Sequence, residues 1–387
     1  MAQAVPYLAG LSCAAWLYLV FLHGRFWRAD QRLGTGPVAT PAEWPCVPVV
    51  VPARNEADVI GQTVESLLRQ DYPHPVCVIL VDDNSEDGTA GAARRAASAA
   101  GQDDRLTVVQ GAPLPPGWAG KVWAMSQGAA QVAQQFPQSP YILFTDADIV
   151  HAPGNLRRLV ARAEAESKDL VSIMVMLAAE GLWERFLVPP FVFFFQMLYP
   201  FDWVNRGTCG VSAAAGGCML VRRSVLERSG GIGSIRGALI DDCALARQLR
   251  AAGGRLWLGL DPETRSSRPY GGLRGVWNMV ARSAFTQLRC SPSLLVLCVA
   301  GMLLVYAVPP IAVAGASWFG PGAALPGLAA CILMAVAYAP TLKLYGRPRI
   351  AAALLPVAAM LYTAMTIASA WRHWRGVGGG WKGRVYP

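Results

Sequence analysis

Charged residues are scarce in this chain of 387 residues: Asp, Glu, Lys and Arg make up 15%, against 53% hydrophobic residues. A composition this apolar excludes an ordinary soluble protein, yet the chain has more polar stretches than a pure membrane bundle needs. The sequence therefore predicts a soluble domain joined to a few membrane spans. Its length allows a domain of ~100–200 residues together with spans of ~20 residues each.

The motifs of several other protein classes are missing as well. The nine cysteines form no CxxC pair and follow no regular spacing, so we interpret them as reduced packing residues. The four histidines stand too far apart for a zinc site with ligands at helical spacing. A P-loop is excluded, because Pro115 and Val122 occupy positions around Lys121 that need Gly and Ser or Thr. The net charge of +9 comes from scattered Lys and Arg, many beside apolar segments, which favours a membrane over nucleic acid as partner.

The N-terminal segment, residues 1–24, is expected to be a membrane anchor. Its apolar run has no basic residue before it and no small-residue cleavage pattern after it, which argues against a signal peptide. Arg25, Arg28 and Arg32 follow the run, and basic residues favour the cytoplasmic side, so the next domain should be cytoplasmic. Residues 25–45 contain many Gly, Pro and Ala residues and are expected to form a linker.

The C-terminal region is the most apolar part of the chain. Across residues 293–372 we expect about three transmembrane helices, from apolar segments near 293–315, 322–342 and 350–371. The loop charges fit a cytoplasmic domain, but three spans would place the basic tail, residues 373–387, outside, against the usual bias.

Two further segments are expected near the membrane surface. Residues 271–292, just before the spans, form an interfacial segment in this interpretation. Residues 186–201 are apolar but contain Pro189 and Pro190 and are short for a span. They fit an interfacial helix, the wall of an acceptor groove or an internal helix of the domain, and the sequence leaves these alternatives open.

Residues 46–270 have an alternating α/β pattern. Short apolar runs at 47–51, 76–81, 106–109 and 141–144 predict strands buried on both faces. After the first run, apolar residues at helical spacing between Val59 and Leu68 predict a helix. Such alternation is typical of a largely parallel, doubly wound sheet.

Acidic residues directly follow two of these strands, where open α/β sheets bind their ligands. Asp82 and Asp83 follow the second strand and could bind a base or ribose, or simply end the strand and cap the next helix. Asp146 and Asp148 follow the fourth strand. In an extended chain they would point the same way, with Ala147 turned away. Two such oxygen donors suit Mg²⁺ or Mn²⁺, which take other ligands from substrate phosphates.

A third acidic pair, Asp241 and Asp242, precedes a helical pattern with Leu245 and Leu249 as its apolar stripe. One interpretation is helix N-capping, which stabilises a helix by roughly 1 kcal/mol. The other is a general base for a transfer reaction. Position in the sequence does not decide between them.

Five motifs stand in order over about 200 residues: Val51–Glu56, Val81–Asp87, Thr145–Asp148, Gly216–Met219 with Arg222-Arg223, and Asp241–Leu245. In this order they resemble the signature of family 2 glycosyltransferases. With the segment Pro116–Ala124 and the C-terminal apolar segments, the whole chain resembles the hopene-associated glycosyltransferases of hopanoid-producing bacteria.

The resemblance implies an α/β fold of the GT-A type, with a Rossmann-like mixed sheet between N-terminal and C-terminal transmembrane helices. It implies inverting, metal-dependent transfer from a nucleoside-diphosphate sugar to a membrane lipid, hopanoid-like or polyprenyl. The protein would be a multi-pass protein of the bacterial inner membrane with its catalytic domain in the cytoplasm.

Matched position by position, the resemblance implies a set of substrate-binding residues: Pro52, Asn55, Glu56, Asp82, Asp83, Lys121, Asp146, Gly216, Gly217 and Arg282. Asp148 and Asp146 are implied as ligands of Mg²⁺ or Mn²⁺. Asp242 is implied as the catalytic base. Asp241, the other member of this catalytic pair, is expected to have a helix-capping or orienting role. Processive members carry Gln/Arg-x-x-Arg-Trp where this chain has Met279–Ser283; the missing Trp argues against a polysaccharide synthase.

Two other functions remain open at this point. A polyprenyl-phosphate glycosyltransferase would share the donor chemistry and differ in its acceptor. A membrane protein could also bind a nucleotide sugar without turning it over, although the intact Asp146, Asp148 and Asp242 favour an enzyme.

Overall fold

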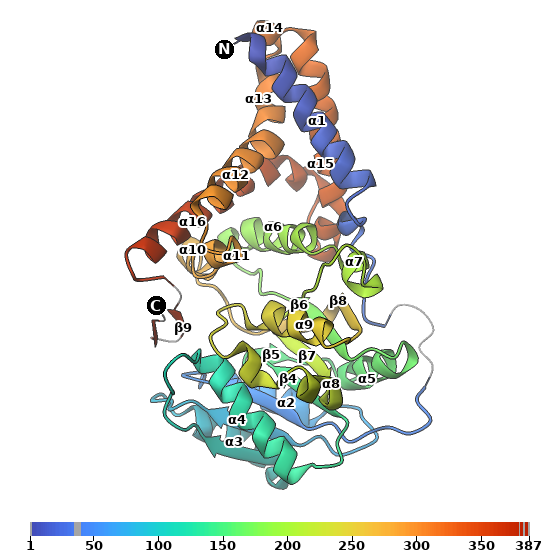
Figure 1. Cartoon of the computed structure of the whole chain (residues 1–387), viewed down its shortest axis with the longest axis vertical. Coiled ribbons are helices and arrows are strands. Elements are labelled where there is room, and N and C mark those ends of the chain that lie inside the picture. The colour runs from blue at the N-terminus through green and yellow to red at the C-terminus, as the bar shows by residue number, and fades with distance from the viewer. Residues whose placement is uncertain (1, 35–39, 379, 382–383, 386–387) are drawn as a thin grey trace.

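The computed structural model describes residues 2–34, 40–378, 380–381 and 384–385. Figure 1 shows a broad α/β domain at one end and a narrow group of helices at the other, with the N-terminus at the tip of the helical part. Residues 35–39 of the expected linker lie outside the described residues, as do residues 379, 382–383 and 386–387 of the expected basic tail.

An eight-stranded sheet forms the centre of the α/β domain, in the order β3-β2-β1-β4-β7-β6-β8-β5. Its strands are β1 Val49–Ala53, β2 Val78–Asp82, β3 Leu106–Gln110, β4 Tyr141–Thr145, β5 Ile149–Val150, β6 Leu170–Met176, β7 Cys218–Arg222 and β8 Leu256–Ser266. The first four are the expected strands, shifted by at most two residues. A separate pair joins β9 Gly380–Trp381 to β10 Arg384–Val385.

Strand direction divides the sheet into two halves. β3, β2, β1 and β4 are parallel, with Val50 opposite both Ile79 and Phe144. β7 is antiparallel to β4 and β6, and β5 is antiparallel to β8, while β6 and β8 are parallel. The Rossmann-like mixed sheet is thus confirmed, whereas a largely parallel sheet, expected from the alternation alone, is wrong. A strand buried on both faces has the same apolar pattern in either direction, so the pattern cannot reveal a reversal.

Helices cover both faces of this sheet. On one face, α2 Ile60–Leu68, α3 Thr89–Ala99 and α5 Asn155–Ala165 share a core with Val49 and Val51. On the other, α4 Gly120–Gln135 and α9 Asp241–Ala251 pack with Val50, because successive side chains of a strand point to opposite faces. The short helices α7 Phe201–Arg206 and α8 Arg223–Arg228 complete the domain.

One glycine shows how closely α4 approaches the sheet. A Cβ atom at Gly128 would collide with the Val50 side chain of β1, so only glycine allows this contact. The contact places the first turn of α4, which carries Lys121, beside the carboxyl ends of the strands.

The helical part joins the N-terminal helix to the C-terminal ones. α1 Val5–Phe21 packs along α13 Val308–Ala314 and α15 Pro321–Leu344, with α12 Pro292–Met302, α14 Ala316–Phe319 and α16 Leu355–Trp374 completing this part. Between α12 and α13, residues 303–307 are π-helical. Pro309 lacks the N–H that would otherwise bond the Val305 carbonyl, and the buried Trp16 of α1 donates its indole N–H to that carbonyl at 2.9 Å.

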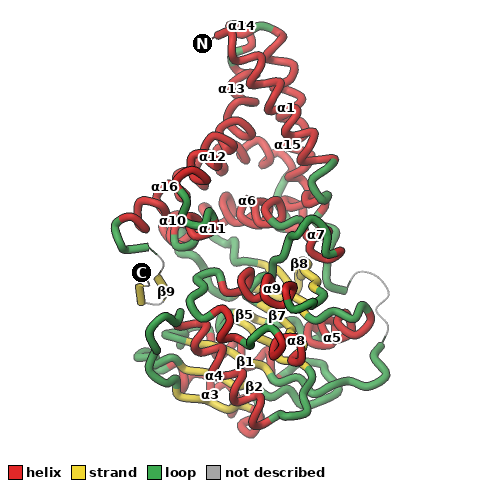
Figure 2. Tube along the Cα trace, viewed as in Figure 1, coloured by secondary structure: helices red, strands yellow, loops and turns green. Residues whose placement is uncertain are grey.

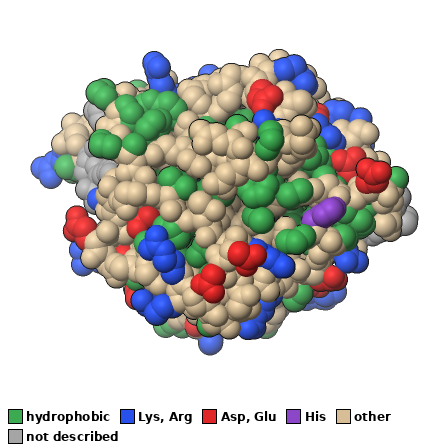
Figure 3. All heavy atoms as spheres, turned by 90° about the horizontal axis from the view of Figure 1, so that it is seen from below, with side chains coloured by type: hydrophobic (Ala, Val, Ile, Leu, Met, Phe, Trp, Pro, Cys, Tyr) green, Lys and Arg blue, Asp and Glu red, His purple; other side chains and the backbone are tan. Residues whose placement is uncertain are grey.

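Among the described residues, four helical stretches are long and apolar enough to cross a membrane: Leu182–Arg206, Pro292–Ala314, Pro321–Leu344 and Arg349–Trp374. The last three agree with the expected C-terminal helices, and α1 is an apolar helix of 17 residues. Their outer surfaces expose apolar side chains such as Leu11, Val296, Leu297 and Ile311. Figure 3, the view from the α/β end, instead shows charged side chains of both signs. This contrast supports association of the helical part with a membrane.

The helix α6 Leu182–Leu198 lies between the two parts of the molecule (Figures 1 and 2). Its Leu187, Val192 and Phe193 side chains are buried inside the molecule, while Phe191, Phe194 and Phe195 line a cavity, so the helix is internal and also forms a wall of that cavity. The helices α10 Leu273–Ala281 and α11 Ala284–Gln287 lie beside α16 and occupy the segment expected at the membrane interface.

Candidate active site

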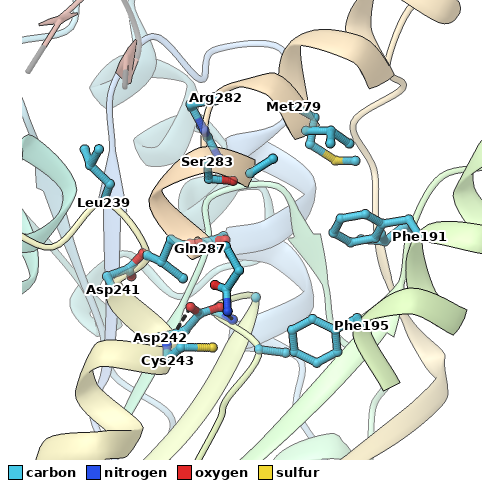
Figure 4. Close-up of a pocket in the computed structure, with 18 of the residues that line it drawn as sticks. Phe191, Phe195, Leu239, Asp241, Asp242, Cys243, Met279, Arg282, Ser283 and Gln287 are labelled. Atoms are coloured by element: carbon cyan, nitrogen blue, oxygen red, sulfur yellow. Dashed lines mark hydrogen bonds between the residues drawn. The ribbon is translucent and has the colours of Figure 1, made fainter. Parts of the chain in front are cut away.

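A cavity of about 1030 Å³ lies where the α/β domain meets the helices above it. One wall consists of strand ends and loops of the α/β domain, and the other of α6, α10, α11, α12 and α16. Figure 4 shows acidic side chains of α9 on one side and aromatic side chains of α6 on another. One continuous space therefore connects the carboxyl ends of the strands with the apolar helices.

Most of the site residues implied by the sequence resemblance line this cavity: Pro52, Glu56, Lys121, Asp146, Asp148, Gly216, Gly217, Asp241, Asp242 and Arg282. The fold thus gathers side chains that are far apart in the sequence. Their individual roles stay predictions.

Lys121, in the first turn of α4, connects two of the acidic motifs. Its Nζ lies 2.7 Å from Asp146 Oδ1 and 3.1 Å from Asp241 Oδ2. Burial alone would lower the pKa of Lys121, but the two carboxylates outweigh burial and raise the pKa above its ordinary value. Lys121 is therefore a firmly charged link between the end of β4 and the start of α9.

Asp146 and Asp148 are held by different partners. Asp148 Oδ2 accepts a hydrogen bond from Ser266 Oγ at 2.8 Å and lies 3.5 Å from Arg268 Nε, whereas Asp146 pairs with Lys121. Residues 147–148 form a turn, so the extended geometry expected for this motif is wrong, although both carboxylates still line the cavity. Burial raises the pKa of Asp146, Lys121 opposes that rise and the charge of Asp148 adds to it. Within the described part of the chain, no three His, Cys, Asp or Glu side chains form a metal-binding group.

Asp242 lies in the first turn of α9, one residue after Asp241. The N-cap position belongs to Ile240, so the helix-capping role considered for the acidic pair is not what the structure shows. Asp242 Oδ2 accepts a hydrogen bond from the N–H of Gly216 at 2.8 Å, and Oδ1 accepts one from the N–H of Cys243 at 2.7 Å. Burial, followed by repulsion from Asp241, raises the pKa of Asp242 to about 6, while Lys121 opposes the rise.

Gly216 allows this arrangement because it has no side chain. A Cβ atom there would lie 3.3 Å from both Asp242 Oδ2 and Lys121 Nζ, closer than most side-chain contacts. The Gly216-Gly217 turn, the base candidate and the lysine therefore pack against one another.

Comparison with known proteins shows what the α/β domain is similar to. Residues 49–230 match the family model described as Glycosyl transferase family 2. The match covers a little under half of the chain. A search of curated proteins finds no match.

One solved mannosyltransferase shares the fold of this chain, and two further solved structures are similar to part of it. A mannosyltransferase from Pyrobaculum calidifontis, in complex with GDP-Man and Mn²⁺, is 22% identical, with a TM-score of 0.53 over 96% of this chain and 99% of that chain. The glucosyl-3-phosphoglycerate synthase of Mycobacterium tuberculosis, in complex with Mg²⁺ and UDP, is 19% identical over 63% and 79% of the two chains (TM-score 0.39). The mannosyl-3-phosphoglycerate synthase of Rubrobacter xylanophilus is 20% identical over 72% and 86% (TM-score 0.36). The family match and the mannosyltransferase fold confirm the GT-A fold class.

Three implied site residues of the α/β domain do not line the cavity: Asn55, Asp82 and Asp83. Asn55 Oδ1 accepts a hydrogen bond from the N–H of Glu86 at 2.9 Å, and Asp82 Oδ1 accepts one from the N–H of Ser85 at 3.0 Å. Asp83 is fully buried, 3.9 Å from Arg54. These side chains hold together the loops after β1 and β2, and their part in nucleoside binding stays a prediction.

His151 supports the candidate site through hydrogen bonds on the side away from the cavity, a role that the sequence did not indicate. Burial lowers the pKa of His151 to about 3, so the ring is neutral and one nitrogen accepts while the other donates. Asn155 Nδ2 donates to Nδ1 at 2.8 Å, Nε2 donates to Thr145 Oγ1 at 2.9 Å, and Thr145 Oγ1 donates to the Gly217 carbonyl at 2.7 Å. This chain of hydrogen bonds ties the end of β4 to the turn that holds Asp242. Its only sequence signal is a histidine shortly after the acidic motif.

Arg268, which follows β8, is a second residue that the sequence analysis missed. Its guanidinium contacts Glu56 as well as Asp148. It joins the loop after β1 to the acidic motif after β4. No motif marks this arginine in the sequence, because its partners lie far away along the chain.

Proposed function

We propose that this protein transfers a sugar from a nucleoside-diphosphate sugar to a hydroxyl group of a membrane lipid, with inversion at the anomeric carbon. One observation carries the proposal: Asp242 lies where the polar and apolar walls of a single cavity meet (Figure 4). A donor bound among the strand-end carboxylates and an acceptor bound among the helices would therefore meet at this carboxylate.

The chemistry needs one base. Asp242 takes the proton of the acceptor hydroxyl as its oxygen forms a bond to the anomeric carbon. The bond from that carbon to the diphosphate breaks, and the nucleoside diphosphate leaves with the electron pair. Because a base works best with a pKa near the operating pH, the raised pKa of Asp242 supports this role. A single direct displacement inverts the anomeric centre.

Asp146 and Asp148 are proposed to hold Mg²⁺ or Mn²⁺ together with the donor diphosphate. Two carboxylates facing one cavity fit these cations, because the donor phosphates and water supply the remaining ligands. Bound there, the cation would stabilise the negative charge of the leaving diphosphate. The Pyrobaculum calidifontis mannosyltransferase contains GDP-Man and Mn²⁺, which supports the donor and cation classes proposed for this chain.

The helical wall supports a lipid acceptor. Phe191, Phe194, Met279 and Met302 line the cavity from α6, α10 and α12, and two of these helices belong to stretches apolar enough to cross a membrane. The sequence resemblance makes a hopanoid-like lipid the first candidate and a polyprenyl phosphate the second. Basic residues after α1 support a catalytic domain on the cytoplasmic side of a bacterial inner membrane.

The proposal can be tested on the full chain purified in detergent. We expect release of GDP from GDP-mannose or of UDP from UDP-glucose to require Mn²⁺ or Mg²⁺ and to rise when lipid acceptor is added. Mass spectrometry of the lipid should show one added hexose. Donor binding without nucleotide release above the level of Asp242→Asn would favour a non-catalytic binding protein and overturn the proposal.

A further inference from the structure

An aromatic row on α6 runs along the cavity and ends in a polar group. Phe191, Phe195 and Tyr199 stand four residues apart at the end of this helix, so they lie on one face, and all three line the cavity. The rings of Phe195 and Tyr199 lie 5.3 Å apart, centre to centre. The wall thus changes from apolar at Phe191 to hydrogen-bonding at the Tyr199 hydroxyl.

The Tyr199 hydroxyl is part of a chain of hydrogen bonds beside Asp242. It accepts a hydrogen bond from Gln287 Nε2 of α11 at 2.5 Å and contacts the thiol of Cys243. Cys243 directly follows Asp242, and its thiol donates to the Ala214 carbonyl at 3.6 Å. Tyr199 therefore connects the helix that carries Asp242 to the side chain of Gln287.

Gln287 is the polar side chain that faces Asp242 from the helical wall. Figure 4 shows it extending from α11 towards Asp242, whereas Arg282 lies further away. In the part of the chain that the structure describes, the Gln287 side chain has Tyr199 as its hydrogen-bond partner, which leaves its amide oxygen and second N–H for a ligand. The amide of Asn278, on α10, is already bound by Arg372 at 2.8 Å.

We infer that Gln287, held by Tyr199, binds the hydroxyl head of the acceptor and orients it towards Asp242. An amide can donate to one lipid oxygen and accept from a neighbouring hydroxyl, so it suits a neutral alcohol, whereas a phosphate head favours a cation. The acceptor is then an amphiphile with a neutral hydroxylated head at Gln287 and an apolar body along Phe191 and Phe195. This inference rests on the proposed function and narrows its acceptor to neutral lipid alcohols.

The test compares transfer to lipid with transfer to water. Wild type, Gln287→Leu, Gln287→Glu and Tyr199→Phe are assayed with GDP-mannose or UDP-glucose. The acceptors, in detergent micelles, are a hydroxylated pentacyclic triterpenoid, farnesol and farnesyl phosphate. For a neutral alcohol, Gln287→Leu should lower kcat/KM by about 10–100-fold, because a hydrogen bond to the substrate hydroxyl is lost. Tyr199→Phe should have a smaller effect of the same kind.

Hydrolysis of the donor by water serves as the internal control, because it uses Asp242 and the donor site without a lipid. The rate of donor hydrolysis should change less than twofold in Gln287→Leu. A matched control is Gln135→Leu, at an exposed glutamine of α4, which should leave both donor hydrolysis and transfer to lipid unchanged. If Gln287→Leu does not fold, Tyr199→Phe, which loses only the hydroxyl that holds Gln287, provides the same comparison with a smaller effect.

The outcomes separate this inference from the proposed function. If wild type transfers sugar to a neutral alcohol and the Gln287 variants match it within twofold, the inference is overturned and the function stands. Transfer by wild type to farnesyl phosphate alone, unaffected at Gln287, also overturns it. If wild type neither transfers sugar to any of the three lipids nor releases nucleoside diphosphate, the proposed function fails and this inference fails with it.

Discussion

The two walls of the cavity are built in different ways. The α/β wall consists of ionised side chains already paired with one another: Lys121 with Asp146 and Asp241, and Arg268 with Asp148 and Glu56. The helical wall consists mainly of aromatic and apolar side chains, with the amide of Gln287 facing the acids.

Because of this difference, the two walls should bind their ligands by different forces. A donor with its cation must exchange existing ion pairs for new ones, so its binding depends on charge and on the exact set of partners. A lipid on the helical wall displaces water from apolar surface, an effect that scales with area and depends little on direction. Substitutions on the two walls should therefore change different kinetic parameters.

The largest effect is expected where the walls meet. Asp242→Asn keeps the shape of the side chain but removes the base, so kcat should fall roughly 10²–10⁴-fold with donor binding nearly unchanged. Asp241→Asn should cost much less, because it removes an ion pair with Lys121 but leaves the base in place. Nucleoside diphosphate release and donor titration would be measured for both variants. A greater loss of turnover in Asp241→Asn would move the base by one residue.

The next largest effect should come from the α/β wall. Asp148→Ala is expected to lower activity about 10²-fold, because the cation that stabilises the leaving diphosphate loses a ligand. EDTA should inactivate the wild type, and added Mn²⁺ should restore the wild type but only weakly the variant. Asp104→Ala, at an exposed acid far from the cavity in the fold, is the control. Full activity of Asp148→Ala in EDTA would contradict this role.

The decrease of activity at low pH should report the pKa of Asp242. With a pKa of about 6, Asp242 is ionised at pH 7 and becomes protonated below pH 6, so kcat/KM should fall, by about tenfold at pH 5. The charge of Asp241 contributes to this raised pKa, so Asp241→Asn should move this acid limb of the pH profile to lower pH. A limb that stays in place or moves upward would contradict the contribution of the Asp241 charge to the pKa of Asp242.

The smallest effect is expected on the helical wall. Phe195→Ala removes apolar contact with the lipid and should raise its KM about fivefold, since partial burial of a Phe ring is worth about 1 kcal/mol. The control is Phe186→Ala, on the same helix but outside the cavity lining. Donor hydrolysis should not change in either variant. An equal rise in KM for both variants would assign the effect to the packing of α6 rather than to lipid contact.

Local patterns in the sequence were sufficient to predict the elements and the acidic motifs. β1, β2, β3 and β4 and the three C-terminal helices lie where runs of apolar residues placed them, because burial in a core or a membrane imposes a period that the chain carries locally. Asp146 and Asp148 were found because they directly follow such an element, and Asp242 because it opens a helical pattern. Motif order then added the family, although the family match ends at residue 230, before Asp242.

Only the tertiary structure decided which side chains meet. The reversed direction of β7, the ion pairs of Lys121 and Arg268, the hydrogen bonds of His151 and the contact of Tyr199 with Gln287 join segments far apart in the sequence. A hydrogen bond or ion pair needs its atoms within about 3–4 Å, a condition that depends on how whole helices and strands pack. The sequence shows the hydrophobic periodicity of each helix or strand, but not the distance between two such elements. The sequence by itself therefore indicated a sugar-transfer chemistry through its acidic motifs. The packing of α6, α9 and α11 decided where the proposed donor, base and acceptor can meet.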